Sequence, residues 1–420
     1  MKEAYVQVLN YAIPAFVLLI LIEYLYGYWA KKQTQNWVDT VASLSSGITN
    51  ILKDVMGLTI GIISYSFLVK HLAVFHFDKN YWYLYVLAFL GKDFAGYWIH
   101  RLEHKINVFW NRHLIHHSSE EYNLPCALRQ SISEIFGYTA LFLLPLAIIG
   151  VPAEVYAVVA PLHLFLQFWY HTQHIEKMGF LEKIIVTPSH HRVHHAINPI
   201  YIDKNFSQIF IVFDKIFGTY QEELPDEKPV YGIKKAVETW NPFIINFQHL
   251  FYLARDAFFT NNWADKLKIW FMPTGWRPED VQLRFPMTII ENPAHQKKYM
   301  PEISNGVVLY AVFSLLFTIA FTLYFFNHLG DLSKFEIGFG TFFIMLTIFG
   351  YTSLMDKSFW ALAAEFVRLV TIAIFFSMTS DWFLFKNYAS FLPYCILIVV
   401  VLSFIYTGYE TYKNYVGKLI

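Results

Sequence analysis

Eight of the histidines of this sequence gather in three short groups. Twelve of the 17 lie between His100 and His195. The groups consist of His100 and His104, of His113, His116 and His117, and of His191, His194 and His195. Residues three and four apart share one face of a helix, so each group points two or three imidazole rings at one place. Neutral imidazole is the commonest nitrogen ligand of metals and suits iron, zinc, copper and nickel. The sequence therefore predicts a metal site built from these eight histidines.

The number of histidines predicts more than one metal ion. A further pair, His171 and His174, follows an apolar segment at the same spacing. Mononuclear zinc takes three or four protein ligands, whereas eight grouped histidines and His171 would give four or five ligands to each of two ions. An all-nitrogen set without thiolates permits iron. We therefore predict a two-metal site with His171 as a ninth ligand and His174 beside the ligands.

The remaining histidines and the nearby acids have lesser predicted roles. His190 adjoins His191, and only one of them can begin the third group, so His190 is excluded. His163 lies in an apolar segment, where a packed or channel-lining role is expected. Glu103 and Asp203 are expected to orient ligand rings through the second ring nitrogen. No role is assigned to the isolated residues His71, His76, His249, His295 and His328.

The composition is that of a membrane protein. The 420 residues are 56% hydrophobic and 15% charged, against about 25% charged in soluble domains. Apolar segments of roughly spanning length cover residues 11–29, 55–74, 81–99, 135–151, 153–169, 307–326, 337–352, 359–378 and 392–409. The segments 135–151 and 153–169 are short and predict a helical hairpin that dips into the bilayer. We expect an all-α polytopic membrane protein with about seven to nine apolar helices.

Three zones follow along the chain. Residues 1–80 are predicted to form N-terminal membrane helices, residues 81–300 the catalytic region with a polar, histidine-rich cap, and residues 301–420 C-terminal membrane helices. Fifteen of the 32 Lys and Arg residues lie between Lys177 and Lys298. This bias favours the cytoplasmic face for the cap and its two-metal site, on the cell membrane of a bacterium or the endoplasmic reticulum of a eukaryote. The net charge of zero gives no indication of a nucleic-acid partner.

Aromatic residues stand next to the histidine groups. Tyr97 and Trp98 precede the first group, and Trp169 and Tyr170 precede His171. We predict that these four rings, together with Phe109, Trp110 and Phe168, line a slot for a lipid tail. Interface anchoring and packing explain any single ring as well.

Five stretches of this sequence resemble the fatty acid hydroxylase and sterol desaturase superfamily, and within it the alkylglycerol monooxygenase branch. The resemblance is dense from about residue 85 to 285. It is carried by the histidine groups and by residues 116–124, 127–131, 187–195, 202–206 and 214–219.

The resemblance implies a membrane-bound, non-haem di-iron monooxygenase whose iron ligands are the eight grouped histidines. Such an enzyme uses dioxygen and an electron donor, tetrahydrobiopterin or a redox protein. It would hydroxylate the carbon next to the ether oxygen of an alkylglycerol, releasing a fatty aldehyde and a glycerol derivative. Lys105 departs from the pattern, because the branch has a glutamate directly after the second histidine of the first group. The resemblance therefore supports iron binding more strongly than pterin use.

Three other functions fit parts of the pattern. The same iron site could serve a hydroxylase or desaturase of fatty acyl, sterol or carotenoid lipids. A metal transporter would place its ligands near the bilayer midplane on broken helices, whereas these groups follow the ends of apolar segments. A zinc hydrolase is not supported, because no His-Glu-x2-His motif is present.

Overall fold

The protein is almost entirely helical. The computed structural model describes residues 2–58, 60–61, 63–134, 136–379, 383–385 and 389–415. Within this part of the chain, strands are limited to a parallel pair of two residues each, β1 (Ile60–Gly61) and β2 (Phe136–Gly137). The predicted all-α class is confirmed.

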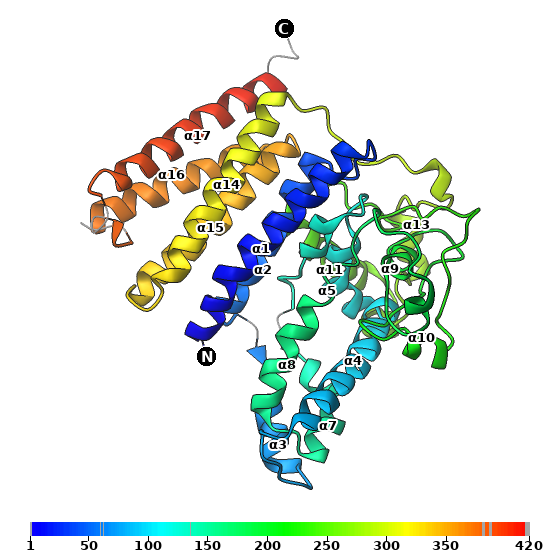
Figure 1. Ribbon diagram of the computed structural model, residues 1–420. Helices are drawn as coiled ribbons and strands as arrows, with labels where there is room; N and C mark the ends of the chain where they lie inside the picture. The colour runs from blue at the N-terminus through cyan, green and yellow to red at the C-terminus, as the bar shows by residue number, and fades with distance from the viewer. Residues whose placement is uncertain are drawn as a thin grey trace.

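Among the described residues, five helices are long and apolar enough to cross a membrane. They are the segment Tyr11–Trp29 of α1 (Lys2–Trp29), α14 (Asn305–Asn327), α15 (Lys334–Met355), α16 (Trp360–Met378) and α17 (Leu392–Tyr415). Helices α14 to α17 form a bundle beside α1 (Figure 1). The chain is an integral membrane protein, but the expected seven to nine spans are not confirmed among the described residues.

The predicted apolar segment 55–74 is not one helix. Helix α2 (Trp37–Met56) ends at Gly57, which adopts φ 66°, and α3 (Tyr65–Leu72) begins after Ser64. Residues 59 and 62 of this segment lie outside the described residues. Ser64 caps α3 by accepting a hydrogen bond from Phe67 N. Since Gly57 breaks the helix in the left-handed conformation, the run is divided before it reaches spanning length.

The predicted hairpin consists of short helices. Residues 136–151 contain α6 (Thr139–Phe142) and α7 (Leu144–Ile149), and α8 spans Ala153–Phe165. Residue 135 lies outside the described part. The 13 residues of α8 extend about 20 Å, less than the roughly 30 Å of a hydrocarbon core. Gly150 makes the turn between α7 and α8 with φ 96°, where a Cβ atom would overlap the carbonyl oxygen of Phe75. The hairpin is therefore too short to cross twice, as predicted.

Helix α2 carries many buried polar residues, so the sequence does not mark it as apolar. Asp39, Ser43, Ser45 and Thr49 are all buried. The helix packs against α14, α15 and α11. It therefore connects the C-terminal bundle with the histidine-rich region.

The cap consists of short helices beyond the end of α4 (Figure 1). Helix α4 (Trp82–Lys105) runs directly into α5 (Asn107–His117). The other elements are η1 (Leu124–Leu128), η2 (Gly179–Lys183), α9 (Pro188–His194), α10 (Val212–Ile216), α11 (Pro242–Phe259), α12 (Trp263–Lys268), α13 (Glu279–Arg284) and η3 (Pro293–His295). Proline at the first helical position starts both α9 and α11, where its missing N–H costs nothing.

Candidate metal centre

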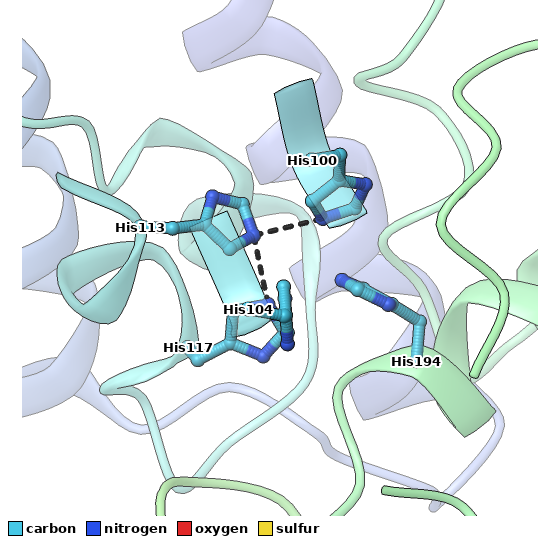
Figure 2. A group of neighbouring side chains, drawn as sticks. All are labelled: His100, His104, His113, His117 and His194. Carbon is cyan, nitrogen blue, oxygen red and sulfur yellow. Dashed lines mark hydrogen bonds between the residues drawn. The ribbon is translucent and has the colours of Figure 1, made fainter. Parts of the chain in front are cut away.

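The nine predicted ligands converge into two groups. The five-histidine group contains His100, His104, His113, His117 and His194. The four-histidine group contains His116, His171, His191 and His195. Within each group, one ring nitrogen of every member lies within 4.8 Å of all the others. Figure 2 shows the rings of the five-histidine group facing one another.

The helical period explains why each His-x2-His-His motif serves both groups. His113 and His117 are four residues apart on α5 and point into the five-histidine group, whereas His116 points into the other. His191 on α9 and His195, which caps that helix, enter the four-histidine group, and the intervening His194 enters the five-histidine group. At 3.6 residues per turn, residue i+4 is turned about 40° from residue i and residue i+3 about 60° in the opposite direction, so the rings of one motif divide between the two groups. The expectation that each of these two motifs points all its rings at one place is therefore wrong.

The distances between ring nitrogens match the ligands of a bound ion. His113 Nε2 lies 2.9 Å from His100 Nε2 and 3.0 Å from His117 Nε2. In the four-histidine group the corresponding Nε2–Nε2 distances are 3.0, 3.1, 3.1 and 3.3 Å. Two nitrogens each about 2.1 Å from one metal ion lie about 3.0–3.4 Å apart at octahedral or tetrahedral angles.

The outer nitrogen of several rings donates a hydrogen bond to a backbone carbonyl. His100 Nδ1 lies 2.7 Å from Phe206 O, His194 Nδ1 lies 2.9 Å from Lys204 O, and His171 Nδ1 lies 3.0 Å from Gln167 O. A carbonyl only accepts, so Nδ1 carries the proton and Nε2 keeps a lone pair directed inward. Burial lowers the pKa of His100 and of His171 to about 3. The rings are therefore neutral at physiological pH and suited to bind a cation.

Two of these inward lone pairs have no partner. His104 Nε2 and His194 Nε2 are buried without a hydrogen bond. Leaving such a group unsatisfied costs about 1–3 kcal/mol. Neighbouring lone pairs at about 3 Å also repel one another, so the donor set fits a metal ion.

Two carboxylates lie behind the five-histidine group, at the residues predicted to orient ligands. Glu103 Oε2 lies 3.5 Å from His113 Nδ1, and Asp203 Oδ1 lies 3.6 Å from His104 Nδ1. Burial raises the pKa of Glu103, while the neighbouring Arg112 guanidinium opposes that rise.

Each of these carboxylates is held by a cation. Arg112 Nη1 lies 2.5 Å from Glu103 Oε1. Lys105 Nζ pairs at 2.6 Å with Asp203 Oδ2. Lys105 is therefore tied to a carboxylate that faces His104.

A buried ion pair that the sequence analysis did not identify ties α2 to this centre. Arg129 Nη2 donates to Asp39 Oδ1 at 2.6 Å, and Arg129 Nη1 donates to Ser118 Oγ at 2.7 Å. Ser118 directly follows His117. The pair therefore fixes the end of α5 against α2, and its one sequence signal is that Arg129 lies in the stretch 127–131.

A second buried chain supports the four-histidine group. Gln167, whose carbonyl accepts from His171, places its side-chain Nε2 3.1 Å from His163 Nδ1. His163 Nε2 lies 2.9 Å from Asp93 Oδ1. Asp93 also accepts from the backbone N–H groups of Ile209 and Phe210. His163 is thus a packed residue, one of the two roles expected for it.

His174 and His190 lie outside both groups. His174 faces the end of α1, with its Nε2 3.4 Å from Thr34 Oγ1 and its ring edge on Tyr26. His190 takes part in a capping box with Thr187 at the start of α9. The exclusion of His190 from the groups agrees with this placement.

A pocket of about 350 Å³ opens on the five-histidine group. His104, His117 and His194 form part of its lining. Further lining comes from Trp110, Trp276, Leu114 and Ile233, and from the α11 residues Tyr252 and Leu253. The cavity therefore lies within the cap, between the five-histidine group and α11.

Of the rings predicted to line the lipid slot, Trp110 lines this pocket, whereas Tyr97, Trp98, Trp169 and Tyr170 do not. Tyr97 is buried and its hydroxyl lies 2.9 Å from Thr219 Oγ1. Trp98 packs on Phe217, and Trp169 and Tyr170 belong to a separate apolar cluster. Much of the wall comes instead from residues 232–289, which fold over the histidines from more than 100 residues further along the chain than His117.

Comparison with known proteins adds the family context. Residues 85–219 match the model of the family described as fatty acid hydroxylase. The alkylglycerol monooxygenase of Homo sapiens is 35% identical over 359 residues, covering 85% of this chain and 80% of the human protein. The alkylglycerol monooxygenase of Danio rerio is 33% identical, covering 87% of this chain and 81% of its own length. An ornithine lipid hydroxylase of Rhizobium tropici is 26% identical over 34% of this chain and 45% of its own length. No solved structure matches the chain significantly.

Proposed function

Because this chain belongs to the alkylglycerol monooxygenase family, we propose that it hydroxylates the carbon next to the ether oxygen of an alkylglycerol. The observation that carries the proposal is the convergence of nine histidines into a five-histidine and a four-histidine group. Each group would hold one iron ion through inward-facing ring nitrogens. Neither group contains a thiolate among its members, in keeping with iron rather than a structural zinc site.

The reaction consumes one dioxygen molecule and two electrons. Two iron ions would supply the activation of dioxygen that removes hydrogen from an unactivated carbon. One oxygen atom enters the C–H bond beside the ether oxygen, and the other leaves as water with two electrons and two protons from the donor. The resulting hemiacetal breaks its C–O bond to give a fatty aldehyde and a free glycerol hydroxyl. Tetrahydropterin is the proposed two-electron donor.

The residues of this chain hold the centre and keep water out. The grouped histidines supply neutral nitrogens, and Glu103 and Asp203 orient His113 and His104. The pocket above His104 would receive the reacting part of the lipid. Because the rings are buried, the reacting carbon would meet the centre in a site of low water content.

The proposed location is a membrane with the cap on its cytoplasmic side. Residues 81–300 would form the catalytic region, between N-terminal helices over 1–80 and C-terminal helices over 301–420. The five candidate spans contain none of the nine grouped histidines. This arrangement supports an enzyme at the interface rather than a transporter with ligands at the bilayer midplane.

The test measures metal content and turnover on detergent-purified protein. We expect about two iron ions per chain, and release of fatty aldehyde from an alkylglycerol under oxygen that depends on added tetrahydropterin. Two irons with turnover of a fatty acyl or sterol lipid instead would contradict the substrate and retain the oxygenase. Zinc, or no bound metal after iron supplementation, would contradict the enzyme class.

A further inference from the structure

Helix α11 has two faces of different character. Gln248, His249, Tyr252, Leu253 and Asp256 lie along one face and line the pocket. The other face carries exposed apolar side chains, among them Ile244, Phe247, Phe251 and Phe258. Phe251 is 63% exposed and Phe258 is 75% exposed. One helix therefore separates the pocket from an uncovered apolar surface.

Exposed apolar side chains continue along α12 and just beyond its end. Trp263, Leu267 and Phe271 follow at intervals of four residues and are 79%, 73% and 71% exposed. Leu402, in the middle of the candidate span α17, is 60% exposed. We define the α11–α12 stripe as Phe247, Phe251, Phe258, Trp263, Leu267 and Phe271. All of these side chains except Phe247 have an exposed fraction at least as large as that of Leu402. Contiguous apolar surface of this kind marks a contact with lipid or protein.

Both ends of the stripe are fixed at the ends of long helices. Before α11 begins, Trp240 N donates to Asp356 Oδ1 at the C-terminal end of α15. Beyond α12, the carbonyls of Trp270 and Met272 accept from Val108 N and Asn107 N, directly after α4. Helix α15 is a candidate span, and α4 contains the segment 81–99 predicted as one. If both helices cross the bilayer as predicted, a segment fixed at these two ends would lie at the level of the membrane surface.

Cationic side chains accompany the aromatic rings of this region. Lys266 Nζ lies 5.5 Å from the ring centre of Trp263 and donates to Phe258 O. Arg284 lies over the ring of Phe259, 4.7 Å from its centre. Lysine and arginine next to tryptophan and phenylalanine are typical of helices in the headgroup layer, where the stem lies in the apolar zone and the charge reaches water.

We propose that the α11–α12 stripe lies in the headgroup layer of the bilayer as an in-plane anchor of the cap. Its apolar side chains contact lipid, and the opposite face of α11 forms a wall of the pocket. The pocket then lies about one helix diameter, roughly 10 Å, from the lipid. That the pocket takes its ligand from the membrane rests on the proposed function, whereas the lipid contact itself does not.

The test places a fluorophore on the stripe in the full-length protein. Cys395 is exposed and Cys126 is buried, so the background carries Cys395→Ser. A nitrobenzoxadiazole label is attached at Phe258→Cys, with Leu402→Cys in α17 as the lipid-facing control and the exposed Asp226→Cys in the cap as the aqueous control. The proteins are reconstituted in phosphatidylcholine vesicles containing lipids brominated near the headgroup or deep in the chain.

We expect the label at Phe258→Cys to lose fluorescence with bromolipids to an extent comparable with the Leu402 control. The loss should be larger for bromine near the headgroup, and iodide should quench only the Asp226 control. Quenching at Phe258→Cys by iodide would show a water-exposed surface and overturn the proposal. Protection from both quenchers would show a protein partner, such as a second copy, and would also overturn it. Leu267→Cys repeats the measurement if Phe258→Cys does not fold. None of these readouts needs bound metal or turnover. A failure of the proposed reaction can therefore be distinguished from a failure of the proposed lipid contact.

Discussion

Replacement of His171 tests whether the four-histidine group holds its own ion. His171 Nε2 lies 3.0 Å from His191 Nε2 and 3.3 Å from His116 Nε2. In His171→Ala three nitrogens remain in the group, and the five-histidine group keeps all of its members. We expect the iron content to fall from about two to about one per chain, with loss of turnover.

The size of the effect follows from the role of the ring. Mutation of residues that only orient a ligand already costs about 10–100-fold in metal affinity or activity. Removal of a direct ligand should cost more than the upper end of this range of about 10–100-fold. We therefore expect the affinity for iron to fall at least about 100-fold, or about 3 kcal/mol. Folding should survive, because Gln167 O loses a single hydrogen bond worth about 1 kcal/mol.

The matched control is His174→Ala, three residues further along the chain. His174 lies outside both groups and faces Thr34, so its removal should leave iron content unchanged. Both variants and the parent protein are dialysed against a weak chelator, and iron per chain is counted by mass spectrometry. Two irons retained in His171→Ala, or an equal loss in His174→Ala, would refute the assignment of His171 as a ligand.

Four further substitutions test the surroundings of the centre. Asp203→Asn should lower turnover about 10–100-fold, because Asp203 contacts a metal ligand. Lys105→Ala removes an exposed ion pair worth at most about 1 kcal/mol, so it should lower turnover less than about fivefold. Equal losses of turnover in the two variants would contradict this order. Asp39→Ala leaves the buried Arg129 charge without its partner, so thermal melting in detergent should show a loss of about 3–5 kcal/mol, and an unchanged midpoint would contradict it. Burial lowers the pKa of His249 from 6.5 to about 4. Between pH 6.5 and about 4 the unfolded chain therefore binds more protons than the folded chain, and the stability of the fold decreases as the pH drops through this range. His249→Gln should make the decrease in melting temperature over this pH range smaller.

The histidine groups could be found from sequence because helical spacing is local information. The i, i+4 separation of His100 and His104 fixes a shared face whatever the tertiary structure. His171 was found from its position after an apolar segment and its partner at i+3. The division into five and four members was not predictable, since it depends on how α4, α5 and α9 meet. That meeting is decided by contacts such as Arg129 with Asp39.

The spans and the pocket show where local reasoning fails. Residues 55–74 are apolar enough to suggest a helix, but Gly57 ends α2 in the left-handed conformation. Serines and Asp39 interrupt the apolar residues of α2, so the sequence does not mark this helix as buried. These polar side chains are nevertheless buried, by partners that are distant in sequence. The pocket walls at Tyr252 and Trp276 are likewise set by tertiary contacts. Hydropathy measures neither kind of long-range pairing.

The two histidine groups differ in their access to the pocket. Substitutions can therefore be chosen that would affect substrate binding and metal binding separately. The pocket reaches the five-histidine group through His104, His117 and His194. No member of the four-histidine group lines it, and that group is supported instead by the buried chain from Gln167 to His163. A lipid in the pocket would therefore meet the five-histidine side first. It follows that loss of a ligand from the four-histidine group should abolish turnover without weakening lipid binding, whereas substitutions at the pocket wall should weaken lipid binding and leave the iron content intact.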